Sequence, residues 1–280
     1  MNRRDFLVFA GAAGGSALLP AELHAVDGSY ELLLSPTAKS GRNTLNLDSD
    51  AGSITTRSYL ETRNCIAADP SLTIPMTIEP LLDPGPRPTW NDAQVDAGIR
   101  RVTAYFRGVT VDENWMAPDK IPAWVSTVPN RFNPPALPGA MSHSNFDAQY
   151  TMAPYALAPD QALVIRGRFP ECRFANVVLW NRLGQTYDYL RRRVSLNRAQ
   201  TALEKDGSFR IVVAHVDPGV PNWLDTERRP SGTLYWRFLL AEGWVETPRA
   251  RVVRLSDIAK ARSNGRMRSM DQPPTVEDDR

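Results

Sequence analysis

One loop concentrates the residues that could perform acid–base chemistry. His215 follows an apolar run, and Asp217 and Asp225 come soon after it. An imidazole that is oriented by a carboxylate can act as a general base or bind a ligand, and two carboxylates can divide acid and base roles between them. One hypothesis is therefore a hydrolase- or lyase-type enzyme that uses His215 with Asp217 or Asp225.

The same loop also has a structural interpretation. Asp217-Pro218-Gly219 places proline and glycine where a type II turn requires them. In that interpretation Asp217 accepts hydrogen bonds from backbone amides, and Trp223 closes the end of the packed core. Ligand binding by Asn222 and Trp223 is the third alternative for this loop.

A second candidate cluster lies in the 180–193 segment. There, aromatic residues lie beside arginine and aspartate at the expected ends of strands. Such sets suit sugars and carboxylated or sulfated ligands, although a solvated hairpin with core aromatics would have the same composition. Arg57, Arg166, Arg168 and Arg237 lie in expected strands, where structural ion pairs are favoured over catalysis. The predicted ligand-binding residues are Trp180, Asn181, Tyr187, Asp188, Arg191, Asn222, Trp223, Trp236 and Arg237.

The sequence predicts neither a metal site nor a cofactor. His143 and His215 are the histidines that follow residue 25, and Cys65 and Cys172 lie too far apart for a zinc motif. In an oxidising compartment the two cysteines could form one disulfide, or they could be separate buried thiols.

Short strand-like runs dominate the elements that must position these residues. These runs are either continuously apolar or alternate apolar with polar residues, and Gly, Pro, Asn and Asp separate them. This punctuation is typical of an antiparallel β sandwich or barrel. The expected strands are 30–34, 54–60, 72–78, 162–168, 174–180, 193–196, 209–214, 233–240 and 250–255.

One amphipathic helix is expected at about 91–107. Val95, Ile99, Val102 and Phe106 form an apolar stripe at helical spacing. Asn91 with Gln94 predicts a capping box, and Gly108 follows as a stop. A second short helix is expected at 256–262, before a disordered tail at 263–280.

A long proline-rich arm joins the helix to the later strands. Residues 109–159 contain Trp115, Trp124, Phe132, His143, Phe146, Tyr150 and Tyr155. A long irregular segment inside a domain is usually functional or disordered, and the aromatic residues argue against disorder. We expect an ordered arm that wraps over a sheet and lines a pocket.

Two parts of the chain share a pattern. The shared pattern is a strand, then a turn-rich loop with Asn-x-Leu, then a strand that contains arginine. It begins at Gly28-Ser29-Tyr30 in the first copy and at Gly207-Ser208-Phe209 in the second. One interpretation is a 26–262 domain of two related β layers, from 26–90 and 160–255, joined by the helix and arm at 91–159. Chance similarity is the alternative.

The second copy resembles a known bacterial family. Six short motifs in this part of the chain are similar to those of the family called domain of unknown function 1214. They are Asp206-Gly207-Ser208, Asp217-Pro218-Gly219, Asn222-Trp223-Leu224 and 234–238, with 167–170 and 178–181 upstream. The resemblance covers about residues 160–245. It implies an exported protein with a jelly-roll-like β sandwich, and it implies no reaction, because the family has no established activity.

The amino terminus predicts export. Arg3 and Arg4 precede an apolar run that ends at Leu19, a pattern typical of a twin-arginine signal peptide. The run is shorter than the ~20 residues that a membrane-spanning helix needs. We expect residues 1–25 to be cleaved after Ala25, delivery by the twin-arginine export machinery to the periplasm or beyond, and no stable membrane insertion.

Composition narrows the choice of partner. Removing residues 1–25 takes away Arg3 and Arg4 but also Asp5 and Glu22, so the net charge stays at +2. This charge is too small to favour nucleic acid. The leading expectation is a mainly β, antiparallel jelly-roll-like sandwich that binds a glycan or an amphiphilic organic acid. The alternatives are the His215 enzyme and an assembly partner for another envelope protein.

Overall fold

A computed structural model describes twelve stretches of the 280-residue chain. His143, Cys65, Phe146, the two leading arginines and the 263–280 tail lie outside them, so the predictions for those positions are not addressed. The described residues are 6–12, 15–18, 31–37, 43–47, 54–63, 76–83, 85–86, 89–108, 111, 121–138, 145 and 147–258.

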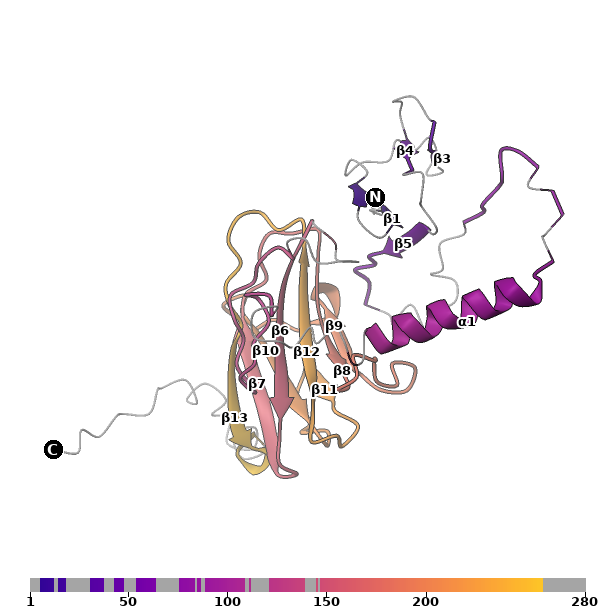
Figure 1. Cartoon of the computed structure of the whole chain (residues 1–280). Coiled ribbons are helices and arrows are strands. Elements are labelled where there is room, and N and C mark those ends of the chain that lie inside the picture. The colour runs from indigo at the N-terminus through magenta and orange to yellow at the C-terminus, as the bar shows by residue number, and fades with distance from the viewer. Residues whose placement is uncertain are drawn as a thin grey trace.

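Two four-stranded sheets form the sandwich in Figure 1, which confirms the predicted fold class. One sheet has the order β11 (Trp223–Asp225), β10 (Phe209–Ala214), β7 (Gln161–Gly167), β13 (Arg249–Arg254). The other has the order β6 (Ala148–Ala156), β12 (Ser231–Leu239), β8 (Phe174–Trp180), β9 (Ser195–Asn197). Neighbours are antiparallel except β10 and β11, which are parallel.

Period-two alternation directs one face of each sheet into a common core. Leu234, Trp236 and Phe238 of β12 are buried in it, together with Ile211 and Val213 of β10. Alternate residues of β12 point to the outer face instead, because successive side chains of a strand leave on opposite sides. This outer face is where the polar and aromatic residues discussed below lie.

The sequence interpretation missed strand β6. Residues 148–156 were expected to be part of an irregular arm, yet they form nine residues of ladder with β12. Pro154 lies within β6, and proline is tolerated at a sheet edge because no partner needs its missing amide hydrogen. β6 is the edge strand of its sheet.

The prediction of one β layer from 26–90 and another from 160–255 needs correction. Both sandwich sheets come from residues 148–254. The described part of 26–90 instead contributes the parallel pair β3 (Leu33–Ser35) and β4 (Thr44–Asn46), and β5 (Ile54–Ser58). β5 pairs with β1 (Phe6–Ala12), and β1 also pairs with β2 (Gly15–Leu18). Strands β1 and β2 lie inside the segment that was expected to be a signal peptide.

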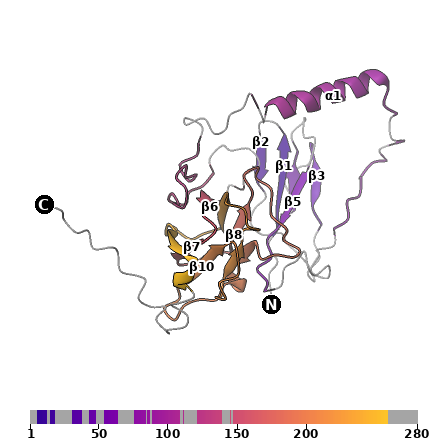
Figure 2. The same ribbon diagram turned by 90° about the horizontal axis from the view of Figure 1, so that it is seen from below.

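Helix α1 (Asp92–Arg107) confirms the local prediction in detail. The Asn91 side chain accepts from the Gln94 amide, the Gln94 side chain accepts from the Asn91 amide, and Gly108 ends the helix. None of the helical residues is buried. Figures 1 and 2 show α1 standing clear of the sandwich.

The described part of the proline-rich arm is ordered and lies along β6, a strand that the sequence interpretation had placed inside the arm. Residues 121–138 form isolated bridges from Val125 to Met152 and from Ala136 to Tyr150. Trp124 packs with the aromatic residues of the outer face, whereas Phe132 is buried in the core between the two sheets. Within the described stretches, no helix combines the length and apolar character needed to cross a membrane.

Candidate functional site

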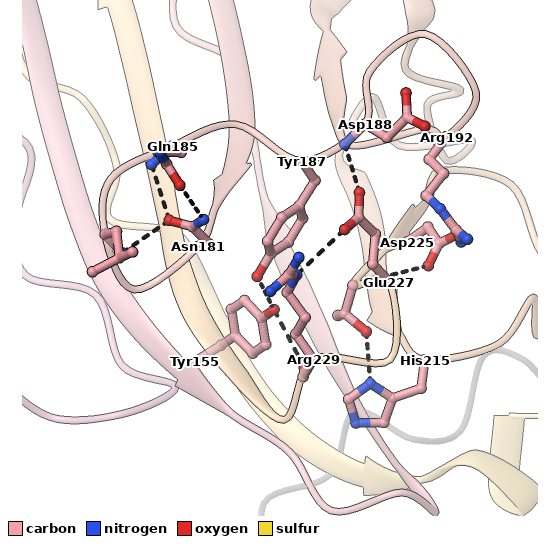
Figure 3. A network of polar contacts seen from close by, with 12 residues as sticks. Tyr155, Asn181, Gln185, Tyr187, Asp188, Arg192, His215, Asp225, Glu227 and Arg229 are labelled. Atoms are coloured by element: carbon pink, nitrogen blue, oxygen red, sulfur yellow. Dashed lines mark hydrogen bonds and ion pairs between the residues drawn. The ribbon is translucent and has the colours of Figure 1, made fainter.

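A polar network closes the end of the sandwich where β6, β8 and β10 finish and β12 begins (Figure 3). Its centre is the 225–229 turn, in which Glu227 and Arg228 both have positive φ, at 53° and 59°. Residues other than glycine seldom adopt this conformation. Hydrogen bonds from Asp188 N to Glu227 Oε1 at 2.5 Å and from Glu227 N to Asp225 Oδ1 at 2.8 Å hold the turn.

The three predicted catalytic residues do not converge. His215 Nδ1 lies 2.6 Å from Thr226 Oγ1, and Nε2 lies 3.3 Å from the Leu157 carbonyl oxygen. Asp225 accepts from Arg192 at 2.6 Å. Asp217 accepts from the Gly219 amide at 2.7 Å, as the turn interpretation expects. No hydrogen bond joins His215 to either aspartate among the described residues, so the predicted pairing of His215 with a carboxylate is not formed there.

Two buried tyrosines form the apolar side of this network. The hydroxyl oxygens of Tyr155 and Tyr187 lie 2.6 Å apart, and the Arg229 guanidinium lies 5.4 Å from the centre of the Tyr187 ring. Burial, followed by the hydrogen bond between them, raises the pKa of Tyr155 far above its ordinary value, and burial raises the pKa of Tyr187. Both phenols therefore stay neutral in the folded protein.

The free energy of unfolding should decrease above about pH 10. An unfolded tyrosine ionises near 10.0, whereas burial raises the folded pKa of Tyr155 and Tyr235. Their stabilising contribution is complete below the unfolded pKa, and each loses about 1.4 kcal/mol per pH unit above it. Urea unfolding of wild type and Tyr155→Phe at increasing pH tests this. The variant should show a shallower decrease, and an unchanged slope would contradict the assignment.

The other predicted ligand-binding residues are scattered. Asn181 caps its own turn by accepting from the Leu183 and Gln185 amides, and Asp188 forms an exposed ion pair with Arg191. Asn222 is buried and bonds to both Ala202 and Arg210 backbones. Trp223 of β11 donates to the Ala214 carbonyl of the neighbouring strand β10 in the same sheet, and Trp236 is completely buried in the core. These contacts are structural.

Arg237 and Trp180 are the two predicted residues that belong to a shared cluster. Arg237 lies on the outer face of β12, in register with Tyr150 of β6 and Asn176 of β8. Trp180 stacks on Tyr235 with ring centres 4.6 Å apart, on the same face. We call Tyr59, Tyr150, Tyr235 and Arg237 the tyrosine–arginine cage.

The cage holds a guanidinium among aromatic rings. The Cζ atom of Arg237 lies 5.2 Å from the Tyr235 ring centre, 5.5 Å from that of Tyr150 and 5.8 Å from that of Tyr59. These distances are in the range of cation–π attraction. Burial lowers the pKa of Arg237, but the surrounding tyrosines outweigh it and the net shift is upward. Arg237 is therefore a permanent, partly exposed positive charge.

The cage lacks the groups that would normally neutralise such a charge. No ion pair joins Arg237 to a carboxylate in the described part of the chain, where eight other ion pairs are formed. Arg237 Nε, Asn176 Oδ1 and Trp124 Nε1 are buried without a hydrogen-bond partner. Arg237 does contact the tyrosines by side-chain hydrogen bonds, but buried polar atoms almost always have partners, so these unsatisfied donors and this acceptor are groups that a polar ligand or water would stabilise. Of the four strand arginines named in the sequence analysis, Arg168 forms an ion pair with Asp206 at 3.0 Å, whereas Arg237 forms none with a carboxylate among the described residues.

A surface groove lies elsewhere, between the arm and the 244–250 segment. It has a volume of about 750 Å³, and Arg131 and Phe132 line its arm side. Trp244 is 75% exposed there, and Glu246 and Arg249 form an ion pair at 3.4 Å. The groove agrees with the expected pocket beside the arm, but its charges are already paired in part.

Sequence reasoning found Arg237 and Trp180 but not the residues that surround them. Tyr235 and Arg237 alternate on one strand, and this period-two pattern places them on one face. Tyr150 and Trp124 were recognised only as aromatic residues of the arm. Tyr59 and Asn176 carried no signal, because their proximity depends on contacts between segments far apart in the chain.

Metal binding finds no support in the described residues. No group of three or more His, Cys, Asp or Glu side chains among them could hold a metal ion. Cys172 is a free thiol, and its burial raises its pKa to about 11, which makes it a poor nucleophile at neutral pH.

The chain is similar to solved structures. A crystal structure of an uncharacterised protein from Burkholderia cenocepacia matches with a TM-score of 0.66 and 26% identity, over 91% of this chain and 70% of that one. The VPA0106 protein from Vibrio parahaemolyticus matches at a TM-score of 0.34 and 20% identity, over 41% of this chain and 33% of that one. No family model and no curated protein matches the chain.

Proposed function

We propose that this chain is a binding protein that holds a small organic acid with a flat apolar group at the tyrosine–arginine cage. The observation that carries the proposal is Arg237, a partly exposed cation whose Nε is buried and which has no carboxylate partner among the described residues. Burying a charge is costly unless it is paired, and a ligand carboxylate would supply the missing pair. The Nε–H that has no acceptor is a donor such a ligand could use.

The aromatic residues of the cage would contact the apolar part of the ligand. Tyr59, Tyr150 and Tyr235 surround the guanidinium, and Trp124 and Trp180 extend the aromatic surface. Ring faces next to a cation suit an amphiphile that is negative at one end and planar at the other. The unsatisfied Asn176 Oδ1 would accept from a ligand hydroxyl. A neutral sugar would leave the charge of Arg237 unpaired, so an organic acid fits better than a neutral glycan.

The contacts of His215 favour binding over catalysis. Both ring nitrogens are engaged, by Thr226 and by the Leu157 carbonyl, and His215 belongs to the network at the sandwich end. A general base needs a nitrogen within reach of the substrate. Within the described stretches, the enzyme alternative therefore has no assembled catalytic site around His215 to support it.

Export and family membership remain part of the proposal. The Arg3-Arg4 start supports twin-arginine export, and the motifs around 206–224 support similarity to the domain of unknown function 1214 family, with a jelly-roll-like strand arrangement. Recovery of the protein only from the cytoplasm of a bacterium that produces it would contradict the export part.

Calorimetric titration with phenylacetate and with its neutral isostere phenylacetamide tests the binding proposal. Phenylacetate should bind the wild-type protein, and phenylacetamide should bind at least about tenfold more weakly, because it cannot pair with the guanidinium. Arg237→Met should abolish phenylacetate binding, whereas Arg237→Lys should keep part of it. The fold should survive both changes, since replacing a buried unpaired charge by an apolar group of similar shape is seldom costly.

Trp244→Ala is the matched control, because it removes an aromatic ring from the other groove. It should leave phenylacetate affinity unchanged. Loss of binding in Trp244→Ala with full binding in Arg237→Met would move the ligand to that groove. Equal affinity for acid and amide would refute recognition by charge.

A further inference from the structure

Two loops at the polar end of the sandwich lie against each other. Residues 181–193 follow β8, and residues 225–230 lead into β12. The Asp225 amide donates to the Arg193 carbonyl at 2.8 Å, and Arg192 forms an ion pair with Asp225 at 2.6 Å. Figure 3 shows part of this contact. We call residues 181–193 and 225–230 the arginine loops.

The arginine loops carry an excess of positive charge. Six arginines and three carboxylates give these loops a net charge of +3, although the whole chain carries only +2. Each carboxylate pairs with one arginine, in the pairs Arg191–Asp188, Arg192–Asp225 and Arg229–Glu227. The other three arginines are exposed and form no ion pair among the described residues; they are Arg182, Arg193 and Arg228.

The backbone is strained where it adds one of these charges. Glu227 and Arg228 both have positive φ, which costs free energy in residues other than glycine. Arg228 is thereby held between two residues that contact the other loop. Glu227 accepts from the Asp188 amide, and the Arg229 guanidinium lies 5.4 Å from the centre of the Tyr187 ring. Strain of this kind is concentrated at functional sites, including ligand clamps.

Large apolar side chains project from the same loops. Leu183, Leu190 and Tyr189 are 73%, 59% and 49% exposed. Arginines attract anionic headgroups to a surface, and neighbouring apolar side chains enter the boundary between headgroups and acyl chains. A soluble polyanion would be attracted by the arginines but would gain little from the leucines. The combination therefore favours an anionic membrane surface as the partner.

A small cavity beside the loops has the polar groups that a phosphate headgroup needs. Its volume is about 210 Å³, and Arg193, Arg63, Ser195 and Gln200 are among the residues that line it. Guanidinium groups bind phosphate oxygens with strong, charge-assisted hydrogen bonds. A lipid phosphodiester would thus find donors at the edge of the basic surface.

From these observations we infer that the arginine loops bind the surface of a bilayer that contains anionic phospholipid. The protein would be held by contact with the headgroup region rather than by a segment that crosses the bilayer. The loops are separate from the tyrosine–arginine cage, because Arg237 lies within β12. Membrane binding and ligand binding at the cage are therefore independent proposals.

Co-sedimentation of the full chain with vesicles tests the inference. Wild type should bind vesicles of equal parts phosphatidylcholine and phosphatidylglycerol at about 50 mM salt, and high salt should weaken this binding by screening. Binding to pure phosphatidylcholine should be at least about tenfold weaker. Arg193→Glu with Arg228→Glu should also reduce binding at least about tenfold, because each basic residue near an anionic surface contributes about fivefold.

Arg173→Glu with Arg249→Glu is the matched control. It makes the same change of charge at exposed positions beside the starts of β8 and β13, at the other end of the sandwich. This variant should bind the anionic vesicles within about twofold of wild type. Circular dichroism of each variant should show the wild-type fold, since all four arginines are exposed.

Leu183→Ser with Leu190→Ser tests the apolar part of the surface. Both side chains are exposed, so the fold should be kept, and vesicle binding should decrease at least about tenfold. Equal binding to neutral and anionic vesicles, or full binding by Arg193→Glu with Arg228→Glu, would overturn the inference. Unchanged binding by the serine variant, with equally tight binding of wild type to dextran sulfate, would identify a soluble polyanion instead and would also overturn it.

Discussion

Trp236→Ala should lower the free energy of unfolding by about 3–5 kcal/mol, the usual cost of removing a large buried aromatic side chain. Trp236 has no exposed surface, and its ring lies 5.1 Å from that of Phe209 and 5.7 Å from that of Phe238. Phe209 of the facing sheet and Phe238 of the same strand both contact it, so the cavity cannot close unless the two sheets move closer together. Urea unfolding followed by circular dichroism measures the loss.

Trp236→Phe separates packing from polarity. The indole Nε1 has no hydrogen-bond partner, so phenylalanine keeps most of the ring contacts and removes an unsatisfied donor. We expect a loss of only about 1 kcal/mol for this variant. If Trp236→Ala cost as little as Trp236→Phe, the assignment of Trp236 to the centre of the core would be wrong.

Gly232→Ala should be the second most damaging change, with a loss of about 3 kcal/mol, at the upper end for overpacking. A Cβ atom at Gly232 would lie 2.5 Å from the Trp180 carbonyl oxygen and 2.7 Å from Cε1 of Tyr155, and would also overlap the Tyr187 hydroxyl. The carbonyl belongs to the paired strand β8 and cannot move alone. Thermal unfolding of the variant measures the cost.

Gly108→Ala provides the control for Gly232→Ala. Nothing lies within 4 Å of a Cβ atom at Gly108, and its φ of −50° suits any residue. Stability should change little. A similar loss in both variants would show that the close contacts at Gly232 do not determine the effect.

Local features were predictable from sequence, and non-local ones were not. The capping box of Asn91 and Gln94 was identified because two residues three positions apart define it. Strands β8 and β10 have the same bounds as predicted, since each is a continuous apolar run. The layer arrangement was mistaken because strand pairing over long sequence separations leaves no local pattern.

The candidate site shows the same division. Arg237 was identified from its type and its place in a strand, but its missing counter-ion could not be deduced. Whether a strand arginine is paired depends on which side chains the other segments bring near it. Tyr59 and Tyr150 come from segments far from β12 in sequence, so the cage exists only in the folded chain.

The edges of the two sheets resist the addition of further strands. β9 and β11 have only three residues each. β6 contains Pro154 and is bridged by the arm, and β13 carries Arg249, Arg251 and Arg254. Short, proline-containing, covered or charged edges are how β proteins avoid aggregation by edge-to-edge pairing. The edges of the sandwich are thus protected from amyloid-like growth.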